Sequence, residues 1–114
     1  YELGRQLGIE AIFTERVDNI MALRRGFEVS EGMNIVICED VVTTGKSSME
    51  VKALLESMGA KVIAIASIID RTNEELELPL ISSLRVEIDT FDADDCPLCK
   101  QGTPVVKPGS RKMD

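Results

Sequence analysis

Histidine is absent from this chain of 114 residues, and aromatic side chains make up 4% of it. A zinc site built on Cys96 and Cys99 would need two further ligands, and no histidine is there to supply them. The cysteines number three, which fits a reducing compartment better than a disulfide framework. No apolar run approaches the ~18 residues that a membrane-spanning helix needs. We therefore expect a cytosolic protein that has no membrane partner.

Basic residues are also scarce. The chain has 13 lysines and arginines against 20 acidic residues, for a net charge of −7 and a pI near 4.6. A nucleic acid or an anionic membrane would require a basic face, so neither is expected as a partner. A small polyanionic ligand is still compatible with this charge if a divalent cation and a few local basic groups offset the field.

Two adjacent carboxylates follow an apolar run, and a hydroxyl-rich turn follows them. The run at residues 35–38 leads into Glu39 and Asp40, and residues 43–48 read TTGKSS before a helical pattern begins. Neighbouring acids suit ribose hydroxyls and a divalent cation, while backbone N–H groups and hydroxyls at the start of a helix suit a phosphate. The stretch predicts a binding site for a phosphosugar.

Two other interpretations compete for this turn. Gly45, Lys46 and Ser47 match the end of a nucleotide-binding P-loop, but Asp40 occupies the place of its first glycine and would repel the phosphates. An ordinary strand-to-helix turn, with Ser47 and Glu50 as a capping box, explains the helix start. It leaves the two adjacent acids unexplained, because like charges side by side are costly unless a ligand uses them.

Short apolar strands alternate with helical patterns along the chain, which predicts one α/β domain with a doubly wound parallel sheet. Apolar residues at 51, 54, 55 and 58 indicate a helix over 47–58, and the apolar run at 61–69 indicates a strand covered on both faces. Further strands are expected at 11–14, 23–29, 34–38 and 85–88, with a loop at 17–23. Because ligands of such sheets bind beyond the carboxyl ends of the strands, Glu39, Asp40, Asp70 and Arg71 are expected on one rim.

Residues 36–45 (VICEDVVTTG) resemble the phosphoribosyl-pyrophosphate motif of type I phosphoribosyltransferases. Further segments resemble the orotate phosphoribosyltransferase family: ERVD at 15–18, LRRGF at 23–27, IDR at 69–71, DCPLCK at 95–100 and VKPGSRK at 106–112. The resemblance covers nearly the whole chain. It implies a type I phosphoribosyltransferase fold that lacks its N-terminal part, with a core at 1–90 and a tail at 91–114 that contributes to the hood or to dimer contacts.

The resemblance also implies an activity: transfer of the 5-phosphoribosyl group from phosphoribosyl pyrophosphate to orotate, giving orotidine 5′-monophosphate and pyrophosphate. Glu39 and Asp40 would be catalytic and would hold Mg²⁺, directly or through water, in a homodimer. Orotate would be bound by Thr43 and Arg71. Phosphoribosyl pyrophosphate would be bound by Glu39, Asp40, Val41, Val42, Thr43, Thr44, Gly45, Lys46 and Ser47, with Arg16, Arg24 and Arg25 as weaker candidates.

Several points stay open at the level of sequence. The mobile loop of the family usually brings a lysine, and residues 18–21 (DNIM) have none. A purine-base phosphoribosyltransferase or a non-catalytic regulator of the same fold would keep the phosphosugar site but would not need Arg71. Arg71 could also simply pair with Asp70 or Glu74 on the surface. Cys96 and Cys99 could be packing thiols, half of a metal site shared in a dimer, or a redox pair; the strand-to-helix turn that a redox pair requires is not expected here.

Overall fold

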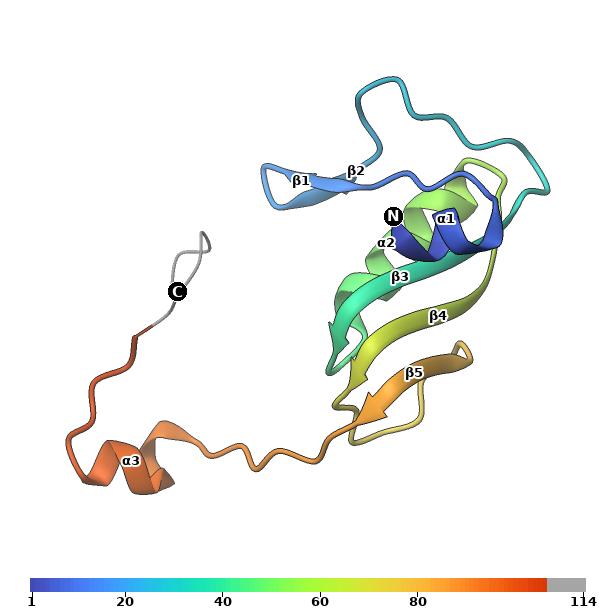
Figure 1. Cartoon of the computed structure of the whole chain (residues 1–114). Coiled ribbons are helices and arrows are strands. Elements are labelled where there is room, and N and C mark those ends of the chain that lie inside the picture. Colours follow the sequence, from blue (N-terminus) through green and yellow to red (C-terminus); the bar gives the residue numbers. More distant parts are fainter. Residues whose placement is uncertain (107–114) are drawn as a thin grey trace.

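The computed structural model describes residues 1–106. Its core is a parallel sheet of three strands with the order β3-β4-β5 (Figure 1). A separate two-stranded antiparallel hairpin is formed by β1 and β2. The elements in chain order are α1 (Glu2–Leu7), β1 (Glu15–Val17), β2 (Ile20–Ala22), β3 (Asn34–Val42), α2 (Lys46–Ser57), β4 (Lys61–Asp70), β5 (Leu80–Arg85), the short 3₁₀ helix η1 (Ala93–Asp95) and α3 (Pro97–Lys100).

The hydrophobic core lies between helix α2 and one face of the sheet. Val51 and Leu55 of α2 are buried, and they share a cluster with Ile37 of β3 and the fully buried Ile65 of β4. The buried residues of α2 match the helical period of 3.6 that the sequence showed. On the other face of the sheet, Ile68 of β4 is 63% exposed, so the expectation of a strand covered on both faces is not met within the described residues. The α/β class and the parallel sheet are therefore confirmed.

The region before the core differs from expectation. No strand forms at 11–14 or at 23–29, and the expected loop at 17–23 contains strand β2. Asp18 and Asn19 both have positive φ, 52° and 65°, which closes a tight turn between β1 and β2. Asp and Asn tolerate this conformation better than other non-glycine residues, so the pair supports a two-residue hairpin. Arg25 and Gly26 also have positive φ, which interrupts an extended path through 23–29.

The start of α2 and the last strand also differ. Gly45 is the N-cap of α2 in a left-handed conformation with φ 78°, and no side chain caps the helix. The predicted capping box of Ser47 and Glu50 is wrong, because the helix begins at Lys46 and places Ser47 inside its first turn. The last strand is β5, earlier in the chain than the predicted 85–88.

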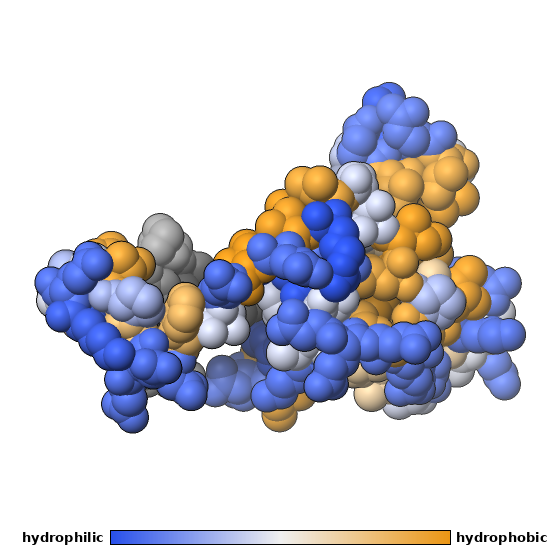
Figure 2. Space-filling model, turned by 90° about the horizontal axis from the view of Figure 1, so that it is seen from below, coloured by the Kyte–Doolittle hydropathy of each residue, from blue (hydrophilic) through white to orange (hydrophobic). Residues whose placement is uncertain are grey.

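The segment after β5 runs away from the sheet and contains α3 (Figure 1). In the space-filling view, the coloured residues of this segment are mainly hydrophilic, whereas apolar residues gather over the main body (Figure 2). Within the described residues, helix α3 packs only against η1, so its geometry is set locally. Of the tail predicted at 91–114, the structure describes residues up to 106, and most of the motif at 106–112 lies outside the described residues.

No helix in the described part of the chain is both long enough and apolar enough to cross a bilayer.

Candidate functional site

The carboxyl ends of β3 and β4 meet at one rim, as the parallel topology predicts. Val42 pairs with Asp70 in the register of the two strands, and the backbone N–H of Arg71 donates to the carbonyl oxygen of Val42 at 2.9 Å. This hydrogen bond continues the ladder by one residue beyond β4. It places Arg71 next to the point where β3 turns into the loop that begins at Thr43.

A hollow of about 530 Å³ opens at the end of β3. Its lining is one continuous stretch of chain, the strand end, the turn and the first turn of α2, so the site is local to a single strand-turn-helix unit. The lining residues are Glu39, Asp40, Val41, Val42, Thr43, Thr44, Gly45, Lys46, Ser47 and Ser48. The structure therefore brings together every residue of the predicted phosphosugar loop.

The two acids have different surroundings. Glu39 is half-buried and accepts a hydrogen bond from the hydroxyl of Ser48 at 3.2 Å, which holds its carboxylate toward α2. Asp40 is exposed, and its Oδ1 accepts the backbone N–H of Val41 at 2.7 Å. One carboxylate is thus anchored by a buried hydroxyl, while the other faces solvent at the hollow.

The carboxylates of Glu39 and Asp40 suit Mg²⁺ better than a metal ion whose ligands all come from protein side chains. Among residues 1–106, no group of three or more histidine, cysteine, aspartate or glutamate side chains could hold a metal ion. Mg²⁺ is usually bound through one or two carboxylates and keeps several waters and substrate oxygens as its other ligands. Glu39 and Asp40 fit that pattern.

The turn approaches the neighbouring loop closely at Gly45. A Cβ atom built on Gly45 would lie 3.0 Å from a methyl carbon of Leu76, which belongs to the loop between β4 and β5. The hydroxyl of Thr44 accepts the backbone N–H of Lys46 at 3.3 Å and supports the same turn. The left-handed φ of Gly45 and this close contact both favour glycine at this position.

Asp70, Thr72 and Arg85 form a network at the end of β4. Oδ1 of Asp70 accepts both the backbone N–H and the hydroxyl of Thr72 at 2.7 Å, and Arg85 donates to Oδ2 of Asp70 at 3.1 Å. Arg85 also donates to the carbonyl oxygen of Thr72 at 2.9 Å. The Thr72 hydroxyl, the Thr72 backbone N–H and then Arg85 hold the pKa of Asp70 below its usual value.

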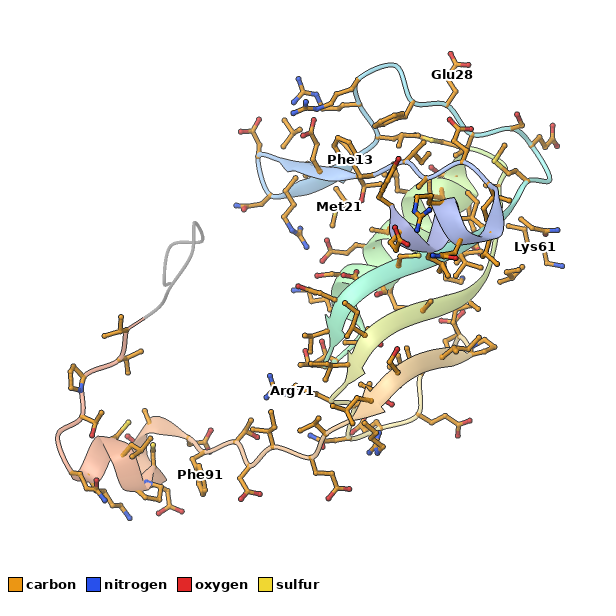
Figure 3. All side chains as sticks on the ribbon, in the orientation of Figure 1. Phe13, Met21, Glu28, Lys61, Arg71 and Phe91 are labelled. Carbon is orange, nitrogen blue, oxygen red and sulfur yellow. The ribbon has the colours of Figure 1, made fainter. Side chains whose placement is uncertain are left out.

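This network contains the residues on both sides of Arg71 but leaves the Arg71 side chain out. Asp70 pairs with Arg85 rather than with Arg71, so the surface pair considered from the sequence does not form. The Nε atom of Arg71 is buried and has no hydrogen-bond partner among the described residues. Figure 3 shows the side chain at the rim of the sheet. A buried guanidinium nitrogen without an acceptor is costly, which indicates a site for an acceptor that comes from a ligand.

The arginines of the N-terminal region are paired elsewhere. Arg16 forms an ion pair with Glu50 of α2 at 2.8 Å, which ties the hairpin to that helix. Arg24 and Arg25 both pair with Glu15 at 3.4 Å. None of the three arginines lines the hollow in this chain.

Sequence reasoning missed several supporting residues. Ser48 is 2% exposed and anchors Glu39, and the run of hydroxyls at 43–48 was the only sequence signal for it. Leu76 and Arg85 lie 31 and 15 residues from the groups that they contact, Gly45 and Asp70. No local pattern in the sequence connects these pairs.

The strand order, the rim and the acid-containing turn agree with the α/β domain that the sequence predicted. Residues 10–92 match the family model of the phosphoribosyl transferase domain, and the chain belongs to this family. The chain is 49% identical to the curated orotate phosphoribosyltransferase of Caldanaerobacter subterraneus subsp. tengcongensis over 115 aligned residues. That match covers 99% of the chain and 60% of the relative, so the chain spans less than two thirds of the relative's length.

Proposed function

We propose that this chain is the phosphoribosyl-pyrophosphate-binding and orotate-binding part of an orotate phosphoribosyltransferase. The enzyme would transfer the 5-phosphoribosyl group to orotate, with orotidine 5′-monophosphate and pyrophosphate as products. Membership of the phosphoribosyl transferase family and the name of the relative both support this proposal. The residues of the site supply further support.

The observation that carries the choice of acceptor is the buried, unpartnered Nε of Arg71. Orotate differs from other pyrimidine bases by its carboxylate, and a planar guanidinium binds a carboxylate through two parallel hydrogen bonds. The backbone N–H of Arg71 is hydrogen-bonded to the carbonyl oxygen of Val42, so Arg71 lies at the rim on which the hollow opens. Thr43, the first residue of the turn, is the second proposed contact of orotate.

Glu39 and Asp40 are proposed to hold the ribose hydroxyls and Mg²⁺. Departure of pyrophosphate leaves positive charge on the ribose, and a fixed carboxylate stabilises such charge in the transition state. Ser48 holds Glu39 in place for this role, while Asp40 is open to ligand and water. Bound Mg²⁺ would neutralise charge on the pyrophosphate leaving group.

The turn from Thr43 to Ser47 is proposed to bind the 5′-phosphate. Its backbone N–H groups at the start of α2 supply donors that have no partner within the helix. Gly45 supplies the left-handed conformation in which this turn leads into α2.

The three N-terminal arginines would act only in an assembled enzyme. Arg16, Arg24 and Arg25 lie outside the hollow, so any contact with pyrophosphate would require a second subunit or a moved hairpin. We propose a homodimer for the whole enzyme, with the tail that begins at residue 91 contributing to the hood or to the contact between subunits.

The proposal is tested by calorimetry on this chain with orotidine 5′-monophosphate, with adenosine 5′-monophosphate as the comparison ligand. We expect binding of the pyrimidine nucleotide only, and we expect Arg71→Lys to weaken it at least ~10-fold, because a lysine cannot form the paired hydrogen bonds. Arg24→Lys is the matched control, since Arg24 is exposed and pairs with Glu15 away from the hollow. Equal affinity for the two nucleotides, or an equal loss in both variants, would contradict the assignment of Arg71.

A further inference from the structure

The tail places Cys96 and Cys99 on one turn of chain. Cys96 is the N-cap of α3 in an extended conformation, with φ −95° and ψ 124°, and Cys99 is the third residue of that helix. The carbonyl oxygen of Cys96 accepts the N–H of Lys100 at 3.0 Å, which closes the turn around the pair. Cys96 is the single extended residue between η1 and α3, so no strand leads into this turn, as the sequence predicted.

Cys96 and Cys99 lie close together along this turn, because the side chain of an N-cap residue is directed toward the third residue of its helix. Both thiols are accessible: Cys99 is exposed and Cys96 is partly exposed. Within residues 1–106 the turn packs only against η1, so it can adjust without disturbing the core.

The two thiols are not equivalent. The pKa of Cys96 is lowered by the backbone N–H and the thiol of Cys99 and, to a smaller extent, by the backbone N–H of Leu98. The Cys96 side chain makes no hydrogen bond that caps α3. The same contact with Cys96, together with desolvation, raises the pKa of Cys99. Lys100 is paired with Asp95 at 3.0 Å, so it does not act as a free cation beside the thiols.

We propose that Cys96 and Cys99 form a reversible redox dithiol that exchanges with a low-molecular-weight disulfide. The Cys96 thiolate attacks one sulfur of the small disulfide, forms a mixed disulfide and releases one small thiolate. The Cys99 thiolate then attacks the Cys96 sulfur, forms the Cys96–Cys99 disulfide and releases the second small thiolate. The protein dithiol is oxidised, the small disulfide is reduced to two thiols, and the step is independent of the proposed transferase activity.

A metal site is the main competing use of the pair. Among the described residues, no third histidine, cysteine, aspartate or glutamate joins the two cysteines in a metal-binding group. A bound metal would need ligands from a second copy of the chain. The local geometry therefore favours exchange between two thiols over metal binding.

The test uses the whole chain with Cys38→Ala, so that only this pair can react, and oxidised glutathione as the probe in the presence of a chelator. We expect the intact mass to fall by two hydrogens with no glutathione retained. Cys99→Ser and Cys96→Ser in the same background should each retain one glutathione. At pH 7 the adduct should form at least about threefold faster on Cys96 than on Cys99, because the thiolate with the lower pKa is more abundant.

Three results would overturn the proposal. Glutathione retained on the Cys38→Ala chain would show that the second exchange does not occur. Equal rates for the two single-thiol variants would remove the distinction between attacking and resolving thiols. Oxidation of the pair in the presence of the chelator but not in a parallel reaction without it would identify a metal site instead.

Discussion

Replacing Gly45 with alanine tests the architecture of the phosphosugar turn directly. Gly45 has φ 78°, in the left-handed region, and a Cβ atom there would lie 3.0 Å and 3.3 Å from the two methyl carbons of Leu76. Gly45→Ala should therefore incur two separate costs in the free energy of unfolding. One comes from the backbone conformation and the other from crowding against Leu76.

The two costs can be separated with a matched glycine. The left-handed conformation costs a non-glycine residue roughly 1–2 kcal/mol. Crowding adds about 1 kcal/mol, the low end for an overpacked site, because Leu76 is only partly buried and its side chain can move. Gly32 has φ 76° and nothing within 4 Å of the position that a Cβ atom would occupy, so Gly32→Ala should incur the backbone cost alone.

The assay is urea unfolding followed by circular dichroism. Gly45→Ala should lose about 2–3 kcal/mol and Gly32→Ala about 1–2 kcal/mol. In a Leu76→Ala background the difference between the two glycine positions should disappear, because the crowded methyl groups are gone. Equal losses for Gly45→Ala and Gly32→Ala in the native background would refute the contact between the turn and the loop at Leu76.

Two further predictions concern the acids of the rim. In the full-length enzyme, Asp40→Asn should lower turnover at least ~100-fold, because it removes charge that is proposed to stabilise the ribosyl cation. Asp89→Asn, at an exposed carboxyl outside the hollow, should leave turnover unchanged. Steady-state kinetics with near-normal turnover for Asp40→Asn would contradict the proposed role. The pKa of Asp70 is lowered in the folded state by Thr72 and Arg85, so its contribution to stability is present above the unfolded-state pKa and is lost as the pH falls through the folded-state pKa. Urea titrations at several pH values should show Asp70→Asn to be less stable than the native chain near neutrality and to approach it in acid, and parallel pH curves for the two chains would count against the network.

The sequence by itself determined the parts of the fold that depend on short-range patterns. The apolar runs before Glu39 and before Asp70 became β3 and β4, and the spacing of Val51 and Leu55 became the buried face of α2. Parallel order then placed Val42, Asp70 and Arg71 on one rim. Glu39 and Asp40 lie inside β3 just before that rim, because the strand continues to Val42 instead of ending at residue 38 as predicted. These features follow from local periodicity, which each short segment contains within itself.

Turn conformations could not be predicted from local patterns alone. The hairpin of β1 and β2 depends on positive φ at Asp18 and Asn19, and the start of α2 depends on positive φ at Gly45. Aspartate, asparagine and glycine all tolerate positive φ, but each of them can also adopt other backbone conformations, so the residue type alone does not decide the turn. The capping-box prediction failed for this reason, because the left-handed Gly45 is the N-cap and α2 begins at Lys46. Glu50 pairs with Arg16 of the hairpin.

Contacts between distant segments were decided only by the tertiary structure. Arg85 reaches Asp70 because β5 lies beside β4 with those two residues in register, and Leu76 meets Gly45 because the loop between the strands folds back on the turn. The unpartnered Nε of Arg71 is likewise seen only in the tertiary structure, where Asp70, a partner considered from the sequence, is paired with Arg85 instead. Strand register and loop path are set by the packing of the whole sheet, so no single segment of the sequence contains them.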